Sequence, residues 1–131
     1  MKQLIYSFFL LVLISCAEDH IGQTPTDGTA PSTITAVEVE STPGGAKISY
    51  TIPKETDISY VKGVYYVNNR EHVVRSSIYK NSLEIEGLGT TDPLDVTLYV
   101  VDHSENVSEP FVVTINPSTP IVELILSSVK L

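Results

Sequence analysis

The chain has 131 residues, enough for one domain of ordinary size, and a formal net charge of −8. An acidic surface repels phosphate backbones and offers no basic patch to anionic lipid headgroups, so we expect no nucleic acid binding. The single cysteine, Cys16, excludes an internal disulfide and a cysteine-based zinc site, so apolar burial must stabilise the core.

The first fifteen residues predict a signal peptide. Lys2 gives a positive start, and Leu4 to Ile14 is an apolar run too short for a bilayer, which needs about 20 residues. The run ends in Leu13-Ile14-Ser15-Cys16, which resembles the bacterial lipobox. That resemblance implies a lipoprotein signal peptide over residues 1–15 and lipidation of Cys16, whose acyl chains would anchor the chain in a membrane. The alternatives are an ordinary secretory signal with a chance cysteine, or a core cysteine.

A tether is predicted over residues 16–33, because the stretch from His20 to Thr33 is rich in Gly, Pro and Thr and nearly free of large apolar residues. Ala17-Glu18-Asp19 resembles the surface-export signal of Bacteroidetes lipoproteins, which implies the cell surface side of the outer membrane. The alternative is a solvated acidic linker.

Alternating apolar and polar residues predict two opening strands. Val37 and Val39 alternate with glutamates in the first, and Ala46 to Ile52 is the most regular amphipathic strand of the chain. Pro43-Gly44-Gly45 predicts the turn between them.

The next predicted strand, Ile58 to Asn68, is apolar on both faces except at Lys62. We place the face of Val61 inward because a lysine is costly to bury. A strand apolar on both faces is either central and covered or part of a binding surface. Asn68-Asn69 favours a hairpin turn, with His72 to Tyr79 as the returning strand.

Three further strands are predicted at Leu83 to Glu86, Val96 to Val101 and Phe111 to Ile115. No stretch after Cys16 shows a helical period. About seven strands predict an all-β, Ig-like antiparallel sandwich over residues 34–116.

Two resemblances support this fold. The pattern L-x-I-x-G-L, followed by a strand and V-D-x-S-x-N-V-S-x-P, is similar to the E–F–G region of fibronectin type III domains, although Leu94 stands about where their corner tyrosine does. From Ser32 to Pro117, PGGAKISYTIP, YVKGVYYV, SSIYKNSLEIEG and VTLYVVDHSENVSEP resemble the N-terminal Ig-like domain of unknown function in multidomain surface lipoproteins of Bacteroidetes.

That family's genes lie among glycan-uptake systems, and a second β-domain follows this one. The resemblance therefore implies a non-catalytic spacer or presentation domain in a glycan-acquisition complex at the outer membrane. Its partners would be the membrane, through the lipid, and glycan or other surface proteins of the complex.

The tail, residues 117–131, is predicted to be a proline-rich linker and then a strand from Ile121 to Leu131. It resembles the opening strand of the family's second domain, which would be missing from a truncated chain. The alternative is an edge strand added to this sandwich.

No catalytic motif of a protease, hydrolase or nucleotide-binding protein occurs, so we expect no enzyme activity, cofactor or metal. Glu84 and Glu86 alternate on the outer face of a strand and are explained as solvated charges. The turn Asp102 to Asn106 has oxygen ligands but lacks the calcium-binding loop pattern, and we interpret it as a turn that satisfies its own backbone.

Four tyrosines are the remaining candidates for ligand binding, because sugars stack on aromatic rings. They are Tyr65, Tyr66, Tyr79 and Tyr99. If Tyr66 and Tyr99 face outward together, they could form a platform, and the chain would be a direct glycan- or protein-binding module. The alternative is that the rings are cross-strand pairs that cover the sheet. Clustered, uncovered rings would favour binding, and dispersed or buried rings would favour the spacer.

Overall fold

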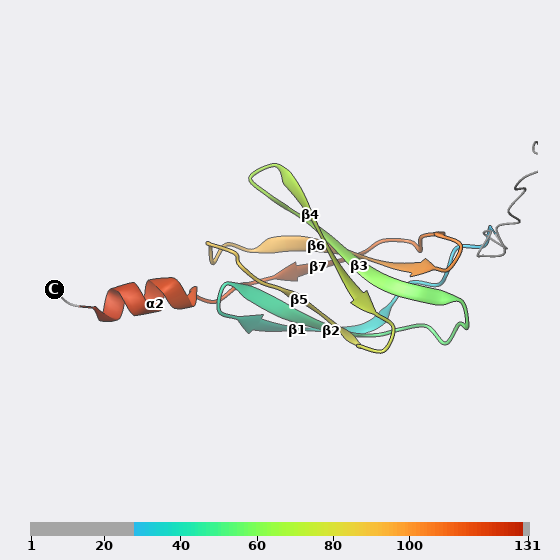
Figure 1. Cartoon of the computed structure of the whole chain (residues 1–131), viewed down its shortest axis with the longest axis horizontal. Coiled ribbons are helices and arrows are strands. Elements are labelled where there is room, and N and C mark those ends of the chain that lie inside the picture. The colour runs from blue at the N-terminus through green and yellow to red at the C-terminus, as the bar shows by residue number, and fades with distance from the viewer. Residues whose placement is uncertain (1–27, 130–131) are drawn as a thin grey trace, which may run out of the picture.

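The computed structural model describes residues 28–129, so Cys16, the predicted signal peptide and most of the predicted tether lie outside the described residues. Seven strands form two antiparallel sheets packed face to face (Figure 1). One sheet has the order β1-β2-β5 and consists of β1 (Thr35–Thr42), β2 (Gly45–Thr51) and β5 (Ser82–Ile85). The other has the order β4-β3-β6-β7 and consists of β4 (Arg70–Ser77), β3 (Ile58–Val67), β6 (Leu94–Asp102) and β7 (Phe111–Ile115). The predicted all-β sandwich of about seven strands is confirmed.

The core lies between the sheets and is built from alternate residues of each strand. Ile48 and Ile85 come from the smaller sheet, and Val61, Leu98 and Ile115 come from the larger one, all without solvent exposure. The inward orientation predicted for the Val61 face is therefore correct.

Two turns explain why the strands reverse where they do. Asn68 and Asn69 have φ angles of 51° and 62° between β3 and β4, which is the backbone of a two-residue hairpin turn with both residues left-handed. The predicted hairpin is confirmed. Gly44, with φ 67°, occupies the same left-handed region between β1 and β2, where its N–H donates to the Ser118 carbonyl at 3.0 Å.

The prediction of a strand from Ile121 to Leu131 is wrong, because Ile121–Ser128 forms the helix α2. The alternative of an added edge strand is wrong too, since neither sheet includes this segment. A strand needs a neighbouring strand for its backbone hydrogen bonds, whereas a helix satisfies them internally. None of the residues of α2 is buried, so burial of apolar side chains does not draw the segment toward a sheet.

The described chain enters the sandwich at one end and leaves through α2 at the other (Figure 1). An odd number of strands that alternate in direction gives this result, since β1 and β7 run the same way along the long axis. No helix within residues 28–129 has the length and apolar character needed to cross a membrane.

Candidate functional site

The outer face of the four-stranded sheet gathers aromatic, apolar and charged side chains. Lys62 pairs with both Arg75 and Tyr99 across the sheet, and alternate residues of a strand share a face. Most of the outward residues form three rows: a cation row of Arg75, Lys62 and Tyr99; a valine row of Val73, Val64, Thr97 and Val112; and an acid row of Glu71, Tyr66, Asp95 and Thr114. Tyr60 and Ser77 form a further outward pair next to the cation row. Pairing of β3 with β6 ends at the valine row, and the β3–β4 hairpin stands away from β6 beyond it (Figure 1).

Two of the four candidate tyrosines do not lie on this outer face. Tyr65 points into the core, is 6% exposed and stacks on His72 with ring centroids 5.2 Å apart. Burial raises its pKa above the ordinary value. Tyr79 follows β4 and is 94% exposed. The structure therefore does not bring these two rings together with the others.

Tyr66 and Tyr99 do face outward on the same side of the sheet, but each has a partner. The Tyr66 ring is 57% exposed, and its hydroxyl donates a hydrogen bond of 2.7 Å to the Glu71 carboxylate. That bond and the charge of Glu71 raise the pKa of Tyr66. The Lys62 ammonium lies 5.2 Å from the centroid of the Tyr99 ring, a cation–π distance.

Sequence reasoning missed a third outward ring and its cation. The Arg75 guanidinium lies 5.6 Å from the centroid of the Tyr60 ring, and the Tyr60 hydroxyl donates to Glu105 at 3.2 Å. The sequence does indicate that Tyr60 faces outward, because Tyr60 and Lys62 are two residues apart on one strand and therefore share a face. The pairing of Lys62 with Arg75 required the strand register.

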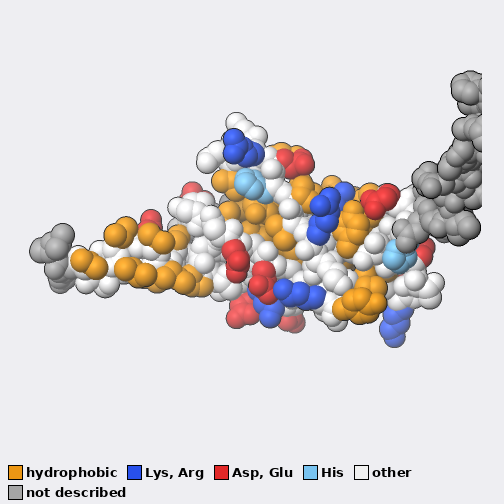
Figure 2. Space-filling view, viewed as in Figure 1, with side chains coloured by type: hydrophobic (Ala, Val, Ile, Leu, Met, Phe, Trp, Pro, Cys, Tyr) orange, Lys and Arg blue, Asp and Glu red, His pale blue; other side chains and the backbone are white. Residues whose placement is uncertain are grey.

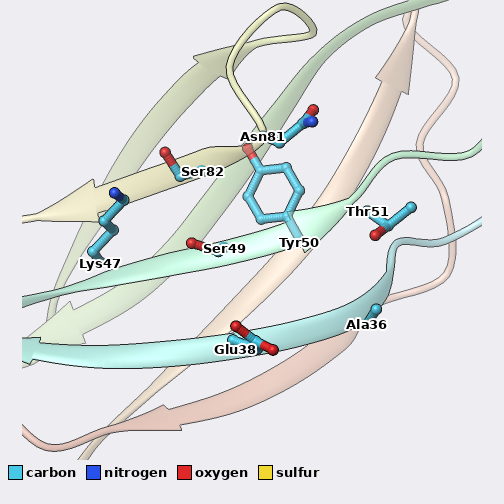
Figure 3. A pocket seen from close by; sticks show the side chains of 8 residues that line it. All are labelled: Ala36, Glu38, Lys47, Ser49, Tyr50, Thr51, Asn81 and Ser82. Atoms are coloured by element: carbon cyan, nitrogen blue, oxygen red, sulfur yellow. The ribbon is translucent and has the colours of Figure 1, made fainter.

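A polar depression of about 500 Å³ lies on the three-stranded sheet (Figure 3). Its lining side chains are mostly polar: Glu38, Lys47, Ser49, Thr51, Asn81 and Ser82, with Ala36 and Tyr50. Tyr50 is 4% exposed, and within the described residues its buried hydroxyl has no hydrogen-bond partner. Burial raises the pKa of Tyr50, and the Ser76 hydroxyl nearby offsets part of the rise without reaching hydrogen-bond geometry.

The turn from Asp102 to Asn106 satisfies its own backbone, as interpreted from the sequence. Asp102 Oδ1 accepts the N–H groups of Ser104 at 2.8 Å and Asn106 at 2.9 Å, and Oδ2 accepts from Asn106 Nδ2 at 2.9 Å. Burial alone would raise the pKa of Asp102. The hydrogen bonds from Asn106 and Ser104 and the charge of His103 outweigh burial and lower the pKa.

No cluster of three or more His, Cys, Asp or Glu side chains that could hold a metal ion occurs in the part of the chain that the structure describes. The outer face of the four-stranded sheet offers hydrogen-bonding groups, cation–π contacts and apolar area, whereas the outer face of the three-stranded sheet offers mostly polar side chains. Protein surfaces use groups of these kinds to bind other molecules.

The fold defines a class: this is a fibronectin type III-like β-sandwich. The FN1–FN3 domains of chicken CNTN1 are similar with a TM-score of 0.59 at 16% identity, over 69% of this chain and 33% of that one. The fn3 domain of human contactin 1 has a TM-score of 0.52 at 14% identity, over 80% of this chain and 95% of that one. The fibronectin type-III domain of human fibronectin type III domain containing protein 3 has a TM-score of 0.50 at 12% identity, over 71% of this chain and 93% of that one. At these identities the likeness shows the fold alone.

The family is more specific than the class. Residues 31–117 match the family described as domain of unknown function DUF4959, and the chain belongs to that family. The comparison with curated proteins gave no match. This chain spans about a third of the chicken CNTN1 chain that it resembles.

Proposed function

We propose that this protein is a lipid-anchored, non-catalytic spacer domain at a bacterial outer membrane, which presents other binding domains or proteins of a glycan-acquisition complex. The observation that carries the proposal is the placement of the two ends. The described chain enters at one end of the long axis and leaves at the other (Figure 1). A domain with that geometry adds its full length between an N-terminal anchor and whatever follows, whereas a domain with adjacent ends would not.

The arrangement of the tyrosines favours the spacer over a direct glycan-binding module. Tyr65 is buried, and Tyr79 lies outside the outer face of the four-stranded sheet. A cation lies over the ring of Tyr99, and the hydroxyl of Tyr66 is engaged by Glu71. Dispersed or covered rings offer little open area for a sugar to stack on.

The anchor is tested by labelling cells with radioactive palmitate. Wild-type protein takes up label and Cys16→Ala does not, because only a thiol at position 16 can receive the diacylglyceryl group. Equal label on both variants, or none on wild type, contradicts the anchor.

The spacer is tested by calorimetric titration of the lipid-free chain, residues 17–131, with a panel of plant and host polysaccharides. Flat heats are expected, and saturable heat with any of them favours the binding module.

A further inference from the structure

The outer face of the four-stranded sheet carries four charges that have no ion-pair partner within the described chain. Arg75 and Lys62 stand directly opposite each other on paired strands, an arrangement of like charges that destabilises a sheet. Glu71 and Asp95, in the acid row, accept hydrogen bonds only from the uncharged hydroxyls of Tyr66 and Thr114, at 2.7 and 2.6 Å. The ion pair found among residues 28–129 is elsewhere, between Lys80 and Glu84.

The cation row and the acid row are too far apart to neutralise each other. Arg75 and Glu71 are four residues apart on β4, which corresponds to about 14 Å at 3.4 Å per residue. The Debye length at physiological salt is about 8 Å. The valine row lies between them, with Val73 and Val112 exposed. Figure 2 shows basic side chains set among hydrophobic ones over β3 and β4.

We propose that this outer face binds a second copy of the chain about a two-fold axis that runs along the valine row, across the strands. Rotation about that axis lays the cation row of each copy over the acid row of the other and brings valine against valine. Arg75 of one copy then faces Glu71 of the second, and Tyr99 faces Asp95. An axis along the strands would instead place cations on cations. The face is thus self-complementary in one orientation, as an isologous dimer requires.

The area of this face indicates how tight the dimer is. Four strands about 4.8 Å apart and three rows about 7 Å apart would cover at most roughly 400 Å² per copy, and the continuous area is smaller because the β3–β4 hairpin stands away from β6 at the acid row (Figure 1). A stable interface buries about 800 Å² per partner. The dimer is therefore weak and reversible in solution, and the net charge of −8 on each copy opposes it further. The contact does not depend on Cys16, so an experiment can contradict the dimer without contradicting the proposed anchor.

Charge-reversal variants test the dimer by sedimentation of the lipid-free chain, residues 17–131, over a concentration series up to 1 mM. The cation-reversed variant is Lys62→Glu with Arg75→Glu, and the acid-reversed variant is Glu71→Lys with Asp95→Lys. Each alone should weaken association at least tenfold, because cation row and acid row then carry the same sign. An equimolar mixture should associate at least as well as wild type, since both contacts become complementary again.

Matched controls separate this face from general charge effects and from α2. Lys47→Glu with Lys54→Glu changes the net charge as the cation-reversed variant does, but lies outside the outer face, and should dimerise more than the cation-reversed variant. A wild type that stays monomeric up to 1 mM overturns the proposal, as does a mixture that does not recover association. Association that survives cation reversal but disappears when residues 121–131 are removed also overturns it, because α2 would then be the contact.

Discussion

At the scale of single residues, Tyr50 shows a local conflict between burial and hydrogen bonding. Its hydroxyl is buried beside Ser76 without a hydrogen bond of good geometry, and a buried, unpaired polar group costs about 1–3 kcal/mol. Tyr50→Phe keeps the ring in the core and removes the hydroxyl. We expect the free energy of unfolding in urea to rise by about 1 kcal/mol. Tyr65→Phe, whose hydroxyl is not among the buried unpaired groups, is the control. A lower stability for Tyr50→Phe would show that the bond to Ser76 forms.

Asp102, in the turn after β6, makes the stability of the fold depend on pH. Its pKa in the folded protein lies below the ordinary value of 3.8, because the hydrogen bonds to Ser104 and Asn106 favour the carboxylate. A lowered folded pKa gives stability that is present above the unfolded pKa and is lost as pH falls through the folded one. Wild type should therefore exceed Asp102→Asn in urea midpoint above about pH 4, and the difference should shrink at lower pH. A difference that does not change with pH contradicts this account.

At the scale of elements, the strands could be predicted from alternating apolar and polar residues, because one face of a strand is buried and the other is exposed to solvent. Ala46 to Ile52 alternates so regularly that only a strand fits, and β2 is found at Gly45–Thr51. Asn68-Asn69 predicted a hairpin because asparagine tolerates positive φ. The segment after Pro120 has no such pattern. Whether it becomes a strand depends on a neighbouring strand, which the local sequence does not encode.

The outer face could be predicted only in part, for the same reason. Alternation in β3 places Lys62 and Tyr66 on one face, which is a property of a single strand. That Arg75 stands opposite Lys62, and Glu71 opposite Tyr66, depends on the hairpin register. Selection by residue type included Tyr65, whose ring faces the core, and omitted Tyr60, whose ring contacts the Arg75 guanidinium.

The helix α2 should contribute little to the stability of the sandwich. None of its residues is buried, while Ser118, just before it, is hydrogen-bonded to Thr42 and Gly44. A chain ending at Pro120 keeps those bonds. We expect its free energy of unfolding in urea to lie within about 0.5 kcal/mol of the longer chain, and its binding of an apolar dye to fall. A loss of more than about 1 kcal/mol would mean that α2 packs on the sandwich in solution.

At the scale of the whole molecule, the proposed spacer and the proposed dimer use different parts of the surface. The ends of the described chain, residues 28–129, lie at opposite ends of the long axis, which suits a spacer (Figure 1). The outer face of the four-stranded sheet suits lateral contact with another copy. A lipid anchor would confine copies to one surface and raise their effective concentration, which a weak contact needs.

The proposed lipid anchor is best tested by the mass of the mature N-terminal peptide, from protein isolated from its native membrane. We expect a peptide that begins at Cys16 and carries the added mass of a diacylglyceryl group and its acyl chains. An unmodified Cys16, or a mature chain that begins at another residue and is recovered in the soluble fraction, would contradict it.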